Sequence, residues 1–192
     1  MSTELELGKV KAKTAAEICA RFRLKEPALA LLSPEQTPSQ FLARLLTERQ
    51  WAAAIRLLAY ALPKREAVWW GCVSLRLAAQ TSAAQELAAL RAAVHWCVHP
   101  SDEHRYASQA ASLALAHGEP ARLVADAAFK SGGSLAPPGA RPMPPQPTMT
   151  ARLVSAALLM AAAGKPADMV ALYRQFLALG IAIAQGKYSW IS

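Results

Sequence analysis

Paired helix start and stop signals recur along this chain of 192 residues and constrain its fold more than any other feature. Thr14 and Glu17 form a capping box, in which each side chain accepts a hydrogen bond from the other residue's backbone N–H. Thr37, Pro38 and Gln40 combine an N-cap residue, a proline in the first helical position and a capping partner. These patterns predict that helices begin at residues 14 and 37.

Apolar residues follow these signals at helical spacing along most of the chain. Alanine and leucine account for 43 and 26 residues, and both lose little side-chain freedom in a helix. Valine and isoleucine, which favour strands, are scarce. The sequence therefore predicts an all-α fold, with helices over residues 14–22, 37 to a polar break near 49, 51–62, 63–79, 82–98, 100–118, 120–130, 150–163 and 166–184.

Two of the predicted helical hairpins share a sequence. Residues 118–125 (GEPARLVA) match residues 164–171 (GKPADMVA), 46 positions later. In each, the glycine suits a left-handed helix stop and the proline a helix start. Repeats of this period suggest stacked helical hairpins, a helical-repeat-like bundle of about eight helices. The alternative is that any tight helical hairpin converges on this motif.

A proline- and glycine-rich segment at residues 131–149 interrupts the helical pattern. Its six prolines and three glycines exclude both helix and strand pairing. It is either an inert linker, which we favour, or a docking strand of polyproline character. The predicted organisation is an N-terminal arm (1–13), a hairpin bundle (14–130), this loop, and a C-terminal hairpin with a tail (150–192) packed on the same domain.

The net charge of +8 is compatible with nucleic acid, an anionic membrane or an acidic protein as partner. The cations are scattered and form no long run. The three cysteines, at positions 19, 72 and 97, are odd in number and lack CxxC spacing, which is typical of a reducing compartment. Two acids precede the first lysine, and no apolar stretch is long enough to span a bilayer. We therefore expect a cytoplasmic protein that does not insert into membranes.

A group of potential metal ligands lies near the middle of the chain, at His95, Cys97, His99 and His104. His95 and His99 share one helical face, as two zinc ligands do. Cys97 falls on another face, and no glutamate stands between the histidines as in an HExxH motif. We therefore expect no bound metal.

Motifs for nucleophilic or phosphate chemistry are missing from the sequence. It contains no GxSxG motif, and Gly132-Gly133 is not followed by a helix that begins with GK[ST]. Asp102 and Glu103 stand at a helix N-terminus, where the helix dipole accounts for them. The sequence therefore favours a protein that is not an enzyme and has no cofactor.

The most distinctive segment is residues 62–72 (LPKREAVWWGC). The adjacent Trp69 and Trp70 point about 100° apart on a helix, so one should pack inward and the other reach a groove or the surface. Arg65 and Trp69, four residues apart, suit a cation–π pair. The segment is either part of the core or a binding hot spot, where Trp and Arg are common. The predicted partner-binding residues are Lys64, Arg65, Trp69 and Trp70.

Several motifs together resemble an uncharacterised bacterial family of small helical proteins, a domain of unknown function. They are AEICARF, TPxxFLxxL and LLAYALPKREAVWWGC, followed by the proline-rich break and the C-terminal hairpin. The resemblance covers residues 14–184, and ALPKREAVWW is its most specific part. Its association with gene clusters of contractile (type VI) secretion implies an adaptor or chaperone for a secreted effector or spike component. It supplies no catalytic residues.

The predicted function is therefore a non-enzymatic protein-interaction module, an adaptor or chaperone-like accessory protein of type VI secretion. A groove with an aromatic anchor and a basic rim would suit an apolar helix or peptide that carries acidic residues. The alternative is a basic helical protein associated with nucleic acid, which the charge of +8 motivates. A salt titration distinguishes the protein-binding from the nucleic-acid-binding function, because phosphate-driven binding weakens steeply as the salt concentration rises.

Overall fold

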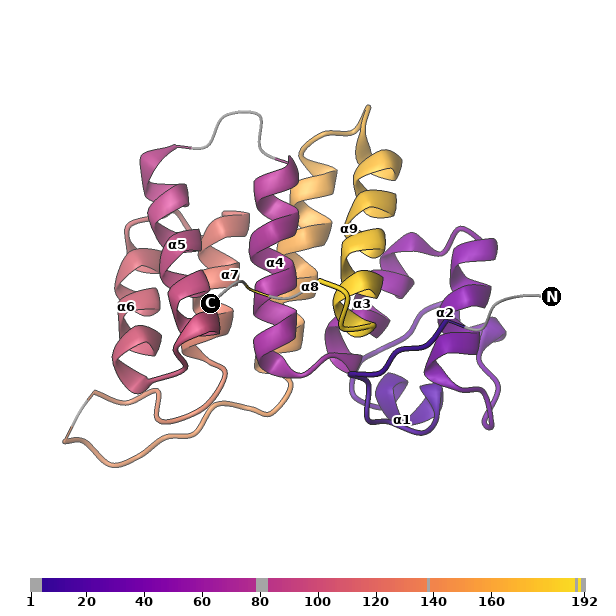
Figure 1. Ribbon diagram of the computed structural model, residues 1–192, viewed down its shortest axis with the longest axis horizontal. Helices are drawn as coiled ribbons and strands as arrows, with labels where there is room; N and C mark the ends of the chain where they lie inside the picture. Colours follow the sequence, from indigo (N-terminus) through magenta and orange to yellow (C-terminus); the bar gives the residue numbers. More distant parts are fainter. Residues whose placement is uncertain (1–4, 79–82, 138, 189, 191–192) are drawn as a thin grey trace.

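The computed structural model describes residues 5–78, 83–137, 139–188 and 190, and within these the chain is helical without strands (Figure 1). The all-α prediction is thus confirmed. The helices are α1 (Ala15–Cys19), α2 (Pro38–Thr47), α3 (Trp51–Ala61), α4 (Lys64–Ala78), α5 (Ala84–Val98), α6 (Asp102–Leu113), α7 (Pro120–Phe129), α8 (Met149–Ala163) and α9 (Met169–Ala184), with a short 3-10 helix, η1 (Leu29–Leu31). No helix in the described ranges is both long and apolar enough to cross a membrane.

The predicted capping box forms completely at α2 and in half at α1. At α2, Thr37 accepts a hydrogen bond from the Gln40 backbone N–H at 3.2 Å, and the Gln40 side chain accepts one from the Thr37 N–H at 3.1 Å. At α1, Thr14 accepts from the Glu17 N–H at 3.3 Å, which is the N-cap half of the predicted box. The predicted cap at Ser82 lies outside the described residues.

The two matching hairpin motifs adopt different backbones. Gly118 has a φ of +90° and reverses the chain just before α7, as predicted. Gly164 instead stays in the right-handed helical region with a φ of −66°, so the left-handed stop predicted there is wrong. The helix predicted to start at Pro166 begins at Met169. At this turn the Lys165 Nζ donates to the Ala78 carbonyl at 2.6 Å and ties the turn to the end of α4.

Helix α4 lies at the centre of the bundle, in contact with α5, α7, α8 and α9 (Figure 1). Three consecutive residues of α4 contact different neighbours. Trp70, fully buried, donates its indole N–H to the Phe176 carbonyl of α9 at 2.7 Å. A Cβ at Gly71 would lie 2.9 Å from Cγ2 of Val124 on α7. The Cys72 thiol donates to the Leu90 carbonyl of α5 at 3.8 Å. Close packing on several sides therefore fixes α4.

The N-terminal third of the chain covers one end of this bundle. Helices α1 and α2 pack on α3, and α3 packs on α8 and α9. The described part of the predicted arm, residues 5–13, runs along the end of α9, where the Lys9 N–H donates to the Ala184 carbonyl at 2.9 Å. This packing brings α3, α8 and the segment after α1 together on one side of the molecule.

The proline-rich loop is irregular, as predicted, but its first residues are docked rather than free. Tyr106 of α6 donates its hydroxyl to the Ala136 carbonyl at 2.8 Å. Lys64 donates to the Ser131 carbonyl at 2.6 Å. Within the loop, the Leu135 N–H donates to the Met143 carbonyl at 2.8 Å. Residues 131–136 are thus held against the bundle by hydrogen bonds, and the choice between an inert linker and a docking strand stays a prediction.

The contact between α4 and α9 allows a test of the core. A Cβ at Gly180 would lie 2.7 Å from Cε2 of the Trp70 indole, which is too rigid to yield. We expect Gly180→Ala to lower the free energy of unfolding by about 1–3 kcal/mol, as overpacking does. This cost exceeds the gain in helix propensity of about 1 kcal/mol. Urea denaturation followed by circular dichroism measures the difference.

Gly164→Ala is the matched control. Its Cβ would meet no atom nearer than 3.5 Å, and the backbone there is already helical. We expect its free energy of unfolding to be unchanged or to rise by up to about 1 kcal/mol. Equal stability of the two variants would show that Trp70 does not pack tightly against α9.

Candidate functional site

Three adjoining hollows surround Tyr60, with volumes of about 320, 150 and 370 Å³. Eight cationic side chains and no acidic ones line them. They come from the segment around α1, from α3, from the start of α4 and from α8, and we call them the basic face: Lys9, Lys11, Arg21, Arg23, Lys25, Arg56, Lys64 and Arg152. Since acidic side chains are missing from the lining, the basic face presents a positive potential to solvent.

Local sequence patterns explain why these cations project outward. Residues 21–25 (RFRLK), in which basic and apolar residues alternate, form the turn and the irregular segment that follow α1. The three cations are exposed, while Phe22 and Leu24 pack against the core. On α3, Arg56 and Tyr60 are four residues apart and share a face, whereas Ile55 and Leu58 are fully buried.

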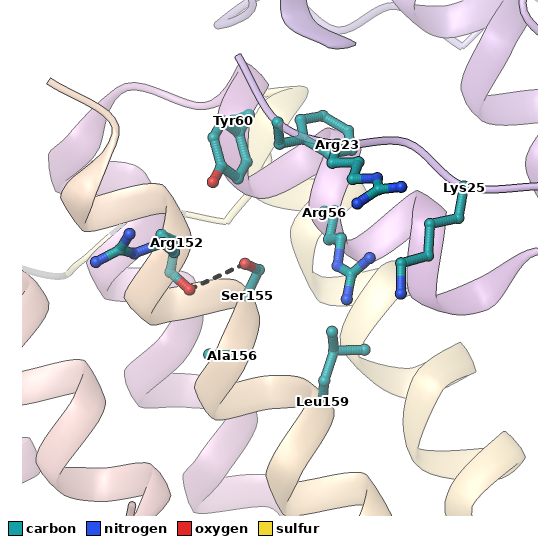
Figure 2. A pocket seen from close by; sticks show the side chains of 9 residues that line it. Arg23, Lys25, Arg56, Tyr60, Arg152, Ser155, Ala156 and Leu159 are labelled. Carbon is teal, nitrogen blue, oxygen red and sulfur yellow. Dashed lines mark hydrogen bonds between the residues drawn. The ribbon is translucent and has the colours of Figure 1, made fainter. Parts of the chain in front are cut away.

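Of the three hollows, the one of about 320 Å³ is lined by the most cations, and we call it the cationic pocket (Figure 2). Arg23, Lys25 and Arg56 point into the same opening, and Arg152 points away on the other side of Tyr60. The Phe22 and Tyr60 rings pack with their centroids 4.7 Å apart and form part of the wall. Among the described residues, Arg23, Lys25 and Arg56 have no side-chain hydrogen bond or ion pair, so their charges are uncompensated.

Tyr60 supplies a neutral polar group at this site. Burial raises the pKa of its phenol above the ordinary value, and the Arg152 and Arg56 charges act in the opposite direction with less effect. The phenol therefore stays protonated at neutral pH and can donate a hydrogen bond to an anion. The Ser155 hydroxyl is already engaged, because it donates to the Arg152 carbonyl at 3.1 Å.

The four predicted partner-binding residues have different environments. Trp70 is fully buried in the core, which removes it from the candidate partner surface. Trp69 is half-buried, so the two indoles differ as their spacing predicts. Arg65 donates to the Cys97 carbonyl and, at 2.9 Å, to the Val98 carbonyl. Lys64, which anchors the loop at Ser131, also lines the basic face.

The chain's own C-terminal tail occupies the surface beside Trp69. Tyr188 and Trp190 have ring centroids 6.2 and 6.4 Å from that of Trp69. The cation–π partner of Arg65 is Trp190, 4.1 Å from the ring centroid, in place of the predicted Trp69. Lys9 approaches the same ring at 5.4 Å. The open aromatic groove predicted here is therefore covered, and the basic face is the more accessible surface.

The potential metal ligands predicted at His95, Cys97, His99 and His104 contact one another and backbone carbonyls. The His104 ring lies 6.2 Å from that of His95 and 6.0 Å from that of His99, and its Nδ1 is 2.9 Å from the His99 carbonyl. Cys97 is buried, and its thiol donates to the Arg65 carbonyl at 3.6 Å. Over the described residues, no group of three or more His, Cys, Asp or Glu side chains is placed to hold a metal ion.

The thiols are predicted to be unreactive in the folded protein. Burial raises the pKa of Cys19 to about 11 and that of Cys97 to about 12, and it also raises the pKa of Cys72. A raised pKa keeps each thiol protonated, so only about one Cys19 in a thousand is a thiolate at pH 8. We expect native protein to react with DTNB about 100-fold more slowly than protein unfolded in guanidinium. Rapid labelling of a native cysteine would contradict this assignment.

The comparisons with known proteins agree with part of the resemblance described above. A model of a family of unknown function, DUF6931, matches residues 41–184. No curated protein and no solved structure gives a significant match to the chain. The matched segment contains α4, Arg56 and Arg152, and it leaves out residues 21–25 and the C-terminal tail. Because the match spans most of the chain, the protein belongs to the family of unknown function DUF6931.

Proposed function

We propose that this protein is a non-enzymatic interaction module that binds an acidic segment of another protein on its basic face. The observation that carries the proposal is the lining of the three hollows around Tyr60, with eight cations and no acid. Of these cations, Lys9 has an ion-pair partner among the described residues, Glu66 at 3.1 Å. A surface of one sign steers an oppositely charged partner to it and selects against basic ones.

The apolar surface between the cations favours a protein partner. Pro63 and Leu62 line two of the hollows, and Phe22 and Leu159 line the third. A peptide that carries both apolar and acidic side chains would match this mixture. Proteins that bind single-stranded nucleic acid usually offer free aromatic faces on which bases stack. Phe22 packs against the Tyr60 ring, which leaves less of that ring free for stacking.

The state of the potential nucleophiles supports a binding role over catalysis. The three cysteines are buried, and burial raises the pKa of each. Ser155, the hydroxyl beside the cationic pocket, donates to a backbone carbonyl instead of a general base. A catalytic nucleophile requires a lowered pKa or an adjacent base.

The resemblance to proteins associated with type VI secretion supports a more specific role. An adaptor or chaperone for a secreted effector or spike component must bind another protein without altering it chemically. A cytoplasmic module with one charged binding face would serve that role, since electrostatic attraction gives fast and reversible association.

A binding assay with defined probes tests the basic face. Lys11→Ser with Arg21→Ser removes two exposed cations of that face. The control, Arg76→Ser with Arg91→Ser, removes two exposed cations elsewhere, on α4 and α5. We expect the first pair to weaken binding of a fluorescent glutamate- and leucine-containing peptide about tenfold, and the control pair less than about twofold. Fluorescence anisotropy measures both.

The same assay decides between protein and nucleic acid. We expect a single-stranded oligonucleotide of equal charge to bind more weakly than the peptide at 150 mM salt, a concentration at which exposed charges are screened beyond about 8 Å. If the oligonucleotide binds more tightly and its affinity falls more steeply with salt, the nucleic-acid alternative is correct. If both pairs of substitutions have equal effects, the basic face is not the binding surface.

A further inference from the structure

We propose that the cationic pocket formed by Arg23, Lys25, Arg56 and Tyr60 binds a phosphoryl group on a side chain of the partner segment. That this phosphoryl group belongs to a protein rests on the function proposed above. The phosphoryl chemistry rests on the pocket itself. The preferred partner is thus an acidic segment that contains one phosphorylated residue.

The first argument is the unbalanced charge. Arg23 and Lys25 come from the segment that follows α1, and Arg56 comes from α3. The fold brings all three to one opening of about 320 Å³ that no acidic side chain lines (Figure 2). Like charges held close together repel, and an anion between them would turn this repulsion into attraction. Glu26, the nearest acid in sequence, accepts a hydrogen bond from the Ala30 N–H at 3.1 Å and does not line the pocket.

The number of cations favours a dianion. A phosphorylated side chain carries about −1.5 to −2 charges at pH 7 and three acceptor oxygens, whereas a carboxylate carries one charge and two oxygens. Two guanidinium groups can each form paired hydrogen bonds to phosphate oxygens, and a lysine adds a compact charge. The Tyr60 hydroxyl adds a neutral donor. One carboxylate would leave most of these donors unused.

The surroundings of the pocket suggest how a peptide would continue. Phe22, Ala156 and Leu159 provide apolar walls, against which the apolar side chains of a peptide could pack. The pocket shares Tyr60 with the two other hollows, where Arg21 and Lys11 stand. A segment with its phosphoryl group in the pocket could therefore place acidic neighbours against the rest of the basic face.

The test uses the full chain and three fluorescent peptides that are identical except at one central residue. The central residue is phosphoserine, serine or glutamate, and the flanks contain glutamate and leucine. We expect the phosphoserine peptide to bind about tenfold more tightly than the serine peptide, with the glutamate peptide between them. Equal affinity of the phosphoserine and glutamate peptides would overturn the proposal, because the pocket would then not distinguish a dianion.

Substitutions assign the preference to the pocket. Arg56→Gln and Arg23→Gln each remove one converging cation, and Arg76→Gln is the control outside the basic face. We expect each pocket variant to reduce the preference for phosphoserine over serine to about threefold or less, while the control keeps it. Arg23 is exposed, so its replacement leaves the core untouched even if Arg56→Gln impairs folding. An unchanged preference in Arg23→Gln would overturn the proposal.

Inorganic phosphate distinguishes the possible sources of the anion. We expect it to compete with the phosphoserine peptide only at a concentration about 100-fold or more above the peptide's dissociation constant, because it lacks the acidic flanks. Competition at equal concentration would show a site for free phosphate and overturn the peptide assignment. If the serine peptide binds and phosphoserine adds nothing, the pocket proposal fails and the proposed function stands. If no peptide binds, yet phosphate raises the melting temperature of wild type but not of Arg23→Gln, the proposed function fails and an anion pocket remains.

Discussion

The indole of Trp70 is clamped between its own helix and the backbone of α9, and the arrangement of the bundle depends on this contact. Gly180 lets the two helices approach until a Cβ there would lie 2.7 Å from the ring, and the indole N–H satisfies the Phe176 carbonyl. On the neighbouring face of α4, Gly71 allows Val124 of α7 to approach so closely that a Cβ there would lie 2.9 Å from its Cγ2. In an alanine-rich core, one large ring and two glycines define which helices can be adjacent, because other pairings would leave a void or a clash.

The position of α4 and α9 then determines which surfaces are open. Helix α9 packs against α4, and the rings of Tyr188 and Trp190, which follow α9, lie beside Trp69. The Arg65 guanidinium lies over the Trp190 ring. This aromatic surface is closed by the chain itself. On the other side, α3 and α8 pack together and the segment after α1 lies across them, which creates the hollows around Tyr60. The tight core and the open basic face are thus two results of one packing arrangement.

Local signals in the sequence predicted the helices well, because capping and helix propensity act over a few residues. The Thr37 box and the start of α7 at Pro120 are examples. The same reasoning failed at Gly164, where a distant tether from Lys165 to Ala78 accompanies a different turn. It also placed Trp70 on a partner surface, although helical spacing alone does not decide which of two adjacent indoles faces the core. The tail over Trp69 depends on contacts between residues more than a hundred positions apart, which no local pattern encodes.

The basic face shows why charge patterns along a sequence underestimate a binding surface. The cations are scattered in the sequence, and on that basis no charged site was predicted beyond Lys64 and Arg65. The alternation of basic and apolar residues at 21–25 was the available signal, since its cations are exposed while Phe22 and Leu24 pack against the core. Arg56 joins these cations only through the fold. Such a cluster of uncompensated cations lowers stability in the absence of an anion, so a ligand that neutralises it stabilises the folded protein as it binds.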